Sequence, residues 1–283
     1  MGVCQSSNAT LSLPVMEVAQ TKSMTSARSA ESNVLLGRLS GDASPDTAKG
    51  RTPKSAAPTP RMITEIEALS AAVEEQLPRG PRICILGGKQ FMDPNSEPSV
   101  RALAQLLAEP LVRSGAVVLT GGLPGVQATF AEELHRAGFE NIVNLVPLGE
   151  QSNYGIGEDL VAGLTMEERM GVFAKLGQIY VCIEGGPGVA KEARDAHQRG
   201  AFVLPLMSTG GASGGAFGFP TAALEAPSFA VAEWATLKAG TPEEVAWAAA
   251  TVIEAVLRDQ EPADGAKNDV PEHRCAEASK VSL

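Results

Sequence analysis

Short apolar runs alternate with helical periodicities along the middle of the chain. Continuous apolar runs of this length predict buried strands, and apolar residues three or four positions apart predict helices. The five runs lie at residues 82–86, 116–120, 141–147, 179–183 and 201–206. An amphipathic segment with Ile66 and Val73 on one face precedes them, and another with Val245 and Val252 follows. We therefore predict a doubly wound, Rossmann-like α/β domain at about residues 62–258, a parallel sheet of at least five strands with helices on both faces.

The two ends of the chain lack this pattern. Residues 1–61 are rich in Ser, Ala, Thr and Pro and are predicted to be a disordered leader, and residues 259–283 are predicted to be a flexible tail. The leader begins with the pattern for N-myristoylation at Gly2, and Cys4 is placed for a second, palmitoyl anchor. Two acyl chains would hold the protein on a membrane surface, whereas a chance match would leave it in the cytoplasm.

Composition excludes several functional classes. The formal net charge of −10 argues against nucleic acid as a partner, because phosphate backbones bind to basic surfaces. There is no apolar run of the length that spans a membrane. The four cysteines lack metal-ligand spacing, and Cys84 and Cys182 lie in strand-like runs, which favours buried thiols over a disulfide. We expect neither a metal ion nor a cofactor.

Glycine clusters follow four of the five predicted strands. Parallel strands end at one edge of a sheet, where α/β proteins bind ligands, and each turn leads toward a helix N-terminus that favours an anion. The sequence contains neither a P-loop nor a good dinucleotide fingerprint, so it favours a mononucleotide. The candidate phosphate- or nucleotide-binding residues are Gly87, Gly88, Gly121, Gly122, Gly125, Gly185, Gly186 and Gly188, and a further cluster lies at residues 210–215.

Arg169 and Glu192 are the candidate charged residues. Thr165 and Glu168 have the spacing of a capping box, which places Arg169 near the start of a helix. A guanidinium pairs naturally with phosphate or with a carboxylate. Alternatively, Arg169 is a surface ion-pair residue, and Glu192 is a solvated helix carboxylate or pairs with Arg194 or Lys191.

Two motifs together resemble the LOG-like family of the SLOG superfamily, long mislabelled lysine decarboxylases. The family pattern is a methionine, two residues and an arginine, followed by P-G-G-x-G-T-x-x-E. The resemblance spans roughly residues 82–258. The matching positions are Met166, Arg169, Gly185, Gly186, Gly188 and Glu192, and the second glycine motif matches through Gly121, Gly122 and Gly125.

The resemblance implies a homodimeric phosphoribohydrolase that cleaves the N-glycosidic bond of a nucleoside 5′-monophosphate, releasing free base and ribose 5-phosphate. Glu192 would be catalytic, Arg169 would hold it or the ligand, and the backbone amides of the glycine turns, with Val189, would hold the phosphate. Segments 149–163 and 210–220 would cover the base or be plain surface loops.

This chain departs from the family pattern at several positions. Glu184 replaces the family's proline, Val189 its threonine, and Gln127-Ala128 a methionine and glycine. These departures favour the alternative, a non-catalytic SLOG domain that senses a nucleotide or an ADP-ribose-like ligand. The retained Arg169 and Glu192 favour the enzyme.

Overall fold

The computed structural model describes residues 60–259, with side chains from Glu65 onward. The leader and tail, including Gly2 and Cys4, lie outside the described residues, so acylation stays a prediction. The helices are α1 (Pro60–Glu74), α2 (Ser96–Ser114), α3 (Val126–Arg136), α4 (Met166–Leu176), α5 (Pro187–Gln198), α6 (Val231–Ala239) and α7 (Pro242–Asp259). The strands are β1 (Arg82–Gly87), β2 (Val117–Thr120), β3 (Ile142–Val146), β4 (Glu158–Val161), β5 (Ile179–Ile183) and β6 (Phe202–Leu206). Two short 3-10 helices, η1 (Met207–Thr209) and η2 (Thr221–Leu224), follow β6.

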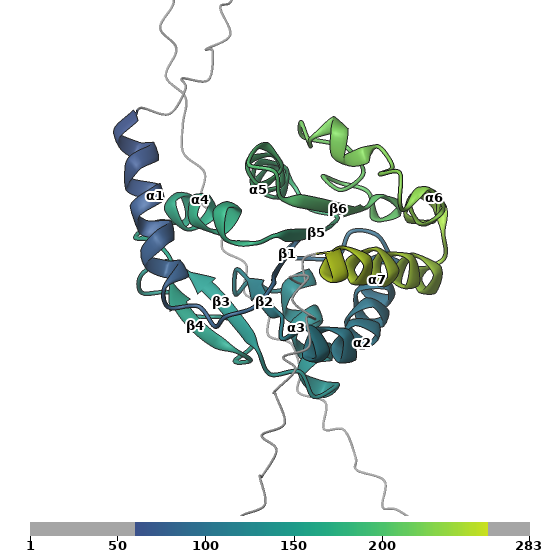
Figure 1. Ribbon diagram of the computed structural model, residues 1–283, viewed down its shortest axis with the longest axis horizontal. Coiled ribbons are helices and arrows are strands. Elements are labelled where there is room, and N and C mark those ends of the chain that lie inside the picture. Colours follow the sequence, from purple (N-terminus) through teal and green to yellow (C-terminus); the bar gives the residue numbers. More distant parts are fainter. Residues whose placement is uncertain (1–59, 260–283) are drawn as a thin grey trace, which may run out of the picture. The chain divides into compact units, whose positions relative to one another are not determined.

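The six strands form one parallel sheet with the order β4-β3-β2-β1-β5-β6 (Figure 1). The chain runs from β1 outward to β4 and then returns to place β5 on the other side of β1. The strand order therefore reverses between β1 and β5. In open α/β sheets, the crevice at such a reversal is where ligands bind.

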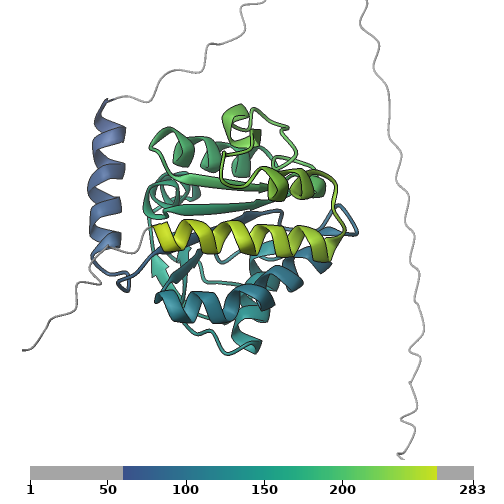
Figure 2. The same ribbon diagram turned by 45° about the vertical axis from the view of Figure 1, so that its right-hand side comes forward.

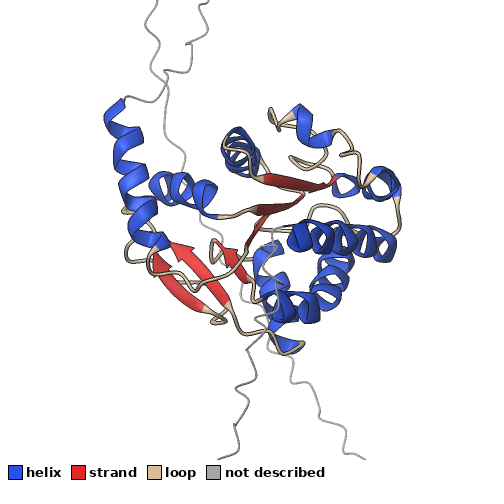
Figure 3. Cartoon of the chain, viewed as in Figure 1, coloured by secondary structure: helices blue, strands red, loops and turns tan. Residues whose placement is uncertain are grey.

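Helices cover both faces of the sheet, as predicted for a doubly wound fold (Figure 3). Alternate residues of β1 point to opposite faces, so Ile83 and Ile85 join one core and Cys84 and Leu86 join the other. Helices α2, α3, α6 and α7 bury their apolar residues in the first core, where α7 packs along α2 (Figure 2). Helices α1, α4 and α5 contribute to the second core. No helix of the described part is long and apolar enough to cross a membrane.

The segment predicted as a base-covering loop, residues 149–163, contains the edge strand β4. Its sequence, Glu158–Val161, is largely exposed and carries two carboxylates, so it lacks the apolar run that marks the other strands. Charged residues on an edge strand discourage pairing with another chain. The first half of the segment does lie against the β2 turn, because the Asn153 N–H donates to Gly122 O at 3.2 Å.

The capping box predicted at Thr165 is present. Thr165 is the N-cap of α4, and its hydroxyl accepts a hydrogen bond from the Glu168 N–H at 3.2 Å. The Glu168 carboxylate reaches back to the Leu164 N–H at 2.7 Å. These contacts fix the start of the helix that carries Arg169.

We expect Thr165→Ala to lower the free energy of unfolding by about 1 kcal/mol, because the Glu168 N–H at the start of α4 loses its acceptor. Urea denaturation followed by circular dichroism measures this change. Thr251→Ala, within α7, is the control and should leave stability unchanged or slightly higher, since alanine favours helix interiors. Equal midpoints for Thr165→Ala and the wild type would show that the cap contributes nothing.

Candidate functional site

The glycine turns after β1, β2, β5 and β6 lie against one another at the carboxyl edge of the sheet. The Val126 N–H donates to Gly88 O at 3.1 Å, which joins the turns after β1 and β2. The Ala212 N–H donates to Gly185 O at 2.8 Å, which joins the turns after β5 and β6. The Glu184 carboxylate bridges the two halves by accepting hydrogen bonds from the segment after β1.

Several of the predicted glycines allow parts of the protein to approach closely. A Cβ on Gly87 would lie 2.4 Å from the Val126 side chain, and one on Gly125 would lie 2.5 Å from Gly88 O. A Cβ on Gly185 would lie 2.6 Å from Val189 Cβ. Gly121 is the most restricted, since its Cβ would lie 1.2 Å from the Arg169 guanidinium. These glycines serve packing at the site.

Backbone amides of the turn after β2 are already bonded within the protein. The Gly121 and Leu123 N–H groups donate to Gln127 Oε1 at 3.0 and 3.2 Å, and the Gly122 N–H donates to Thr120 Oγ1 at 3.0 Å. The Gln127 side-chain amide also donates to Ile85 O at 3.0 Å. In the sequence, Gln127 is only a departure from a motif. In the structure, its side-chain oxygen accepts hydrogen bonds from amides of the turn that was predicted to hold phosphate.

The start of α5 is different, because its donors are free. The N–H groups of Gly186, Gly188 and Val189 donate to no acceptor within residues 60–259. No atom comes within 4 Å of a Cβ built on Gly186, and only Met170 Cε, at 3.5 Å, approaches one built on Gly188. The Val189 side chain is buried beneath Gly185. Free amides, open space and the positive end of a helix dipole are the features that favour an anion.

Arg169 and Glu192 form a buried ion pair. Arg169, from α4, is 1% exposed, and Glu192, from α5, is 5% exposed. One guanidinium nitrogen of Arg169 donates to Glu192 Oε1 at 2.7 Å, and its Nε donates to Leu145 O at 2.9 Å. The guanidinium also lies over the Phe173 ring, 4.8 Å from its centroid. The alternative that Arg169 is a surface ion-pair residue and Glu192 a solvated helix carboxylate is therefore wrong.

The remaining polar atoms of this pair have different surroundings. Arg169 Nη2 is sealed from solvent against Gly121 and has no hydrogen-bond partner in the described chain. Glu192 Oε2 likewise has no partner there, but it is not among the atoms sealed from solvent. Arg169 thus holds Glu192 through Oε1, and Glu192 Oε2 is left without a partner in the described chain.

Burial raises the pKa of Glu192 to about 7, while the charges of Arg169 and Lys191 oppose this shift. A carboxyl group with this pKa exists in both protonation states near neutral pH, as proton-transfer catalysis requires. Gly188 and Glu192 are four residues apart on α5, so they share one face and are separated by about 6 Å along the helix axis. An anion at the start of α5 would therefore have Glu192 one turn away.

The buried cysteines do not form a second reactive site. Cys84 and Cys182 are buried free thiols, as predicted. Burial raises the pKa of the Cys84 thiol to about 12, which makes it a poor nucleophile at neutral pH. Within the described residues, no three His, Cys, Asp or Glu side chains are grouped so that they could hold a metal ion.

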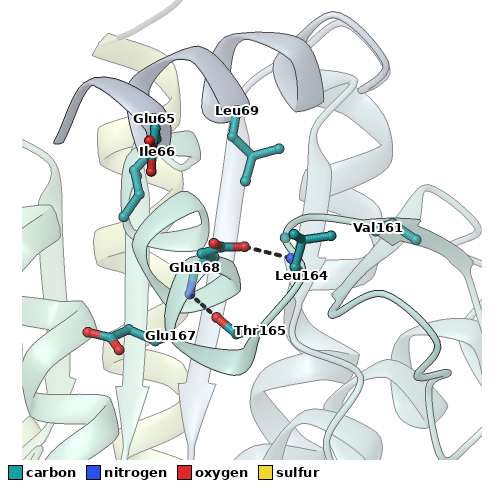
Figure 4. A pocket seen from close by; sticks show the side chains of 9 residues that line it. Glu65, Ile66, Leu69, Val161, Leu164, Thr165, Glu167 and Glu168 are labelled. Atoms are coloured by element: carbon teal, nitrogen blue, oxygen red, sulfur yellow. Dashed lines mark hydrogen bonds between the residues drawn. The ribbon is translucent and has the colours of Figure 1, made fainter. Parts of the chain in front are cut away.

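A separate groove of about 420 Å³ lies between α1 and the start of α4 (Figure 4). Leu69 and Leu164 supply part of its apolar lining, and Glu167 and Glu168 supply acidic groups. None of the candidate glycines lines it, nor does Glu192. The groove is therefore distinct from the candidate site.

No family model matches this chain, and no curated protein matches it. Among solved structures, the chain is similar to a structural-genomics protein designated TM1055, with 27% identity, a TM-score of 0.41, and coverage of 47% of this chain and 78% of that one. A molybdenum cofactor carrier protein from Chlamydomonas reinhardtii shows 23% identity and a TM-score of 0.37 over 44% of this chain and 75% of its own. A molybdenum cofactor binding protein from the phototrophic bacterium Rippkaea orientalis shows 21% identity and a TM-score of 0.38 over 44% and 76%. Because these TM-scores are below 0.5, a function for this chain rests on the residues of the site and not on these similarities.

Proposed function

We propose that this protein hydrolyses the N-glycosidic bond of a nucleoside 5′-monophosphate, releasing free base and ribose 5-phosphate. The observation that carries the proposal is the Glu192 carboxyl group, held by Arg169 one helical turn beyond the free amides of Gly186, Gly188 and Val189. A 5′-phosphate bound at the start of α5 would leave its ribose beside Glu192. The resemblance to the LOG-like family supports the same reaction.

The reaction adds one water molecule. Its oxygen forms a bond to the anomeric carbon while the bond from that carbon to the base nitrogen breaks. The base leaves with the electron pair of the broken bond and gains, in net, the proton that water loses to Glu192, which restores the carboxylate. Positive charge builds on the sugar ring in the transition state, so the Glu192 carboxylate stabilises it and takes the proton of the attacking water. Arg169 keeps that carboxylate oriented.

Incubation of the purified full chain with a panel of nucleoside monophosphates, including AMP and a cytokinin ribotide, tests the proposal. Free base is followed by chromatography, and binding by the shift in melting temperature. The corresponding nucleosides are the control, because they lack the phosphate that α5 would hold. Release of base from monophosphates and not from nucleosides supports the proposal. A panel without base release or thermal shift would overturn it.

A second candidate function is ligand binding without cleavage. The depth of Glu192 favours it, because a carboxyl group only 5% exposed has restricted access to a sugar. Val189 also lacks the hydroxyl of the family's threonine, which could bond to phosphate. A thermal shift with a monophosphate, without release of base, would support this function over hydrolysis.

A further inference from the structure

Glu184 occupies an unusual position at the reversal of strand order. It follows β5 directly, is 2% exposed, and has a φ of 52°, a left-handed conformation that side chains other than glycine's seldom adopt. Strained residues of this kind persist where the surroundings fix them, and they cluster at functional sites.

The Glu184 carboxylate is held by backbone amides. Its Oε1 accepts from the Met92 and Asp93 N–H groups at 3.0 and 2.8 Å, and its Oε2 lies 3.1 Å from the Met92 nitrogen. Oε2 also lies 3.3 Å from the position of a Cβ built on Gly88. Within the described chain, Glu184 forms no ion pair with Lys, Arg or His. The negative charge therefore rests on the segment after β1.

The backbone of Glu184 holds the segment after β6. Its N–H donates to Thr209 Oγ1 at 2.9 Å, and its carbonyl accepts from the Ser213 N–H at 3.1 Å. One residue thus joins the segments that follow β1, β5 and β6, around the crevice that the fold offers to a ligand.

In doubly wound folds, amides of the turn after the first strand bind the pyrophosphate of a dinucleotide. Here the Glu184 carboxylate accepts the hydrogen bonds of the Met92 and Asp93 amides, which a ligand phosphate would otherwise accept. The start of α5 then keeps its free amides, whereas the Met92 and Asp93 amides after β1 are bonded to a carboxylate. A second phosphate placed there would meet this carboxylate in place of the Met92 and Asp93 amides.

We propose that Glu184 is a specificity-determining residue that restricts the site to ligands with a single phosphate and excludes diphosphates and dinucleotides. This inference rests on the proposed function, because it takes the start of α5 as the phosphate site. It also names the ligand class for both candidate functions: a monophosphate is accepted, and an ADP-ribose-like ligand is rejected.

Two substitutions at Glu184 separate the effect of its negative charge from the effect of its hydrogen bonds to the Met92 and Asp93 amides. Glu184→Gln keeps the shape and removes the charge, while Glu184→Gly frees the amides of Met92 and Asp93 and suits the left-handed backbone. Titration calorimetry with AMP, ADP and ADP-ribose on the full chain gives the affinity ratios. We expect the wild type to favour AMP by at least about tenfold, the cost of a close like charge, and Glu184→Gly to lose that preference. Glu184→Gln should be intermediate.

Glu133→Gln is the matched control. Glu133 is another buried carboxylate, on α3, and it bonds to Arg101 and Arg136 instead of to the site. Its substitution should leave the AMP to ADP-ribose ratio unchanged. A wild type that binds ADP-ribose as tightly as AMP overturns the inference whether or not the variants fold, as does an unchanged ratio in Glu184→Gly. If the wild type binds no phosphorylated ligand, the proposed function fails as well.

Discussion

Glu192→Gln is expected to slow the release of base from AMP by about a thousandfold, within the range for loss of a group that acts in proton transfer. The substitution keeps the size of the side chain and removes the negative charge that would face the sugar. AMP binding should persist, because the free amides of α5 are unaffected. Initial rates by chromatography and affinity by calorimetry measure the two effects separately.

Asp195→Asn is the control for this variant. Asp195 lies on the same helix and pairs with Lys191 at the surface, 2.8 Å away, so its loss should leave the rate unchanged. Full activity in Glu192→Gln would remove Glu192 from the mechanism. Loss of AMP binding together with activity would instead make it a binding residue.

The pH dependence of the wild type follows from the same carboxyl group. Burial raises the pKa of Glu192 to about 7, and the active form is the carboxylate, so kcat/KM should rise with pH and level off above about pH 7. Calorimetry over the same range is the control, since the phosphate of AMP titrates near pH 6. A flat kcat/KM profile between pH 5 and 8 would contradict the role of Glu192.

Arg169→Met should have the largest effect on stability, lowering the free energy of unfolding by about 3 to 5 kcal/mol at pH 8. The loss leaves the Glu192 carboxylate buried and uncompensated. Its pKa would rise further, because Arg169 is among the charges that now lower it. A folded-state pKa above the unfolded value of 4.5 means that stability falls as pH rises between those two values. The deficit of the variant should therefore be smaller at pH 5.5 than at pH 8, as urea denaturation at both values would show.

The double variant Arg169→Met with Glu192→Leu tests whether the deficit comes from the unpaired charge. Replacing both members of a buried pair with apolar residues is often neutral, so the double variant should regain most of the lost stability. If it stays as unstable as the single variant, the lost contacts to Leu145 and Phe173 matter more than charge.

Much of the fold could be predicted from the sequence because continuous apolar runs mark strands that are buried on both faces. The run at residues 82–86 became β1, and that at 179–183 became β5, its neighbour in the sheet. The strand β4 escaped prediction because an exposed edge strand with two carboxylates has no apolar signal. Helix α6, at Val231–Ala239, also escaped prediction, and no strong periodicity marks it.

The sequence predicts which charged residues form the site, but it does not predict what each residue of the site contacts. Arg169 and Glu192 were singled out from motif spacing, and the structure brings them into contact across 23 positions of sequence. Which backbone amides remain free depends on the partners of each one, and sequence spacing carries no such information. Gln127 and Glu184 looked like departures from a motif. Both side chains accept hydrogen bonds from backbone amides, and these contacts cannot be read from the motif.

The placement of β5 beside β1 also has a consequence for synthesis of the chain. Ile83 on β1 is paired with Ile179 on β5. One hydrogen-bonding edge of β1 therefore has no partner until a strand 96 residues later has been synthesised. At roughly 5 to 20 residues per second, the ribosome needs on the order of 5 to 20 s to supply that partner. During this interval, the backbone N–H and C=O groups along that edge of β1 lack their partners, while β2 to β4 can already add to its other edge. The nascent chain is therefore most vulnerable to aggregation before residue 183 has emerged.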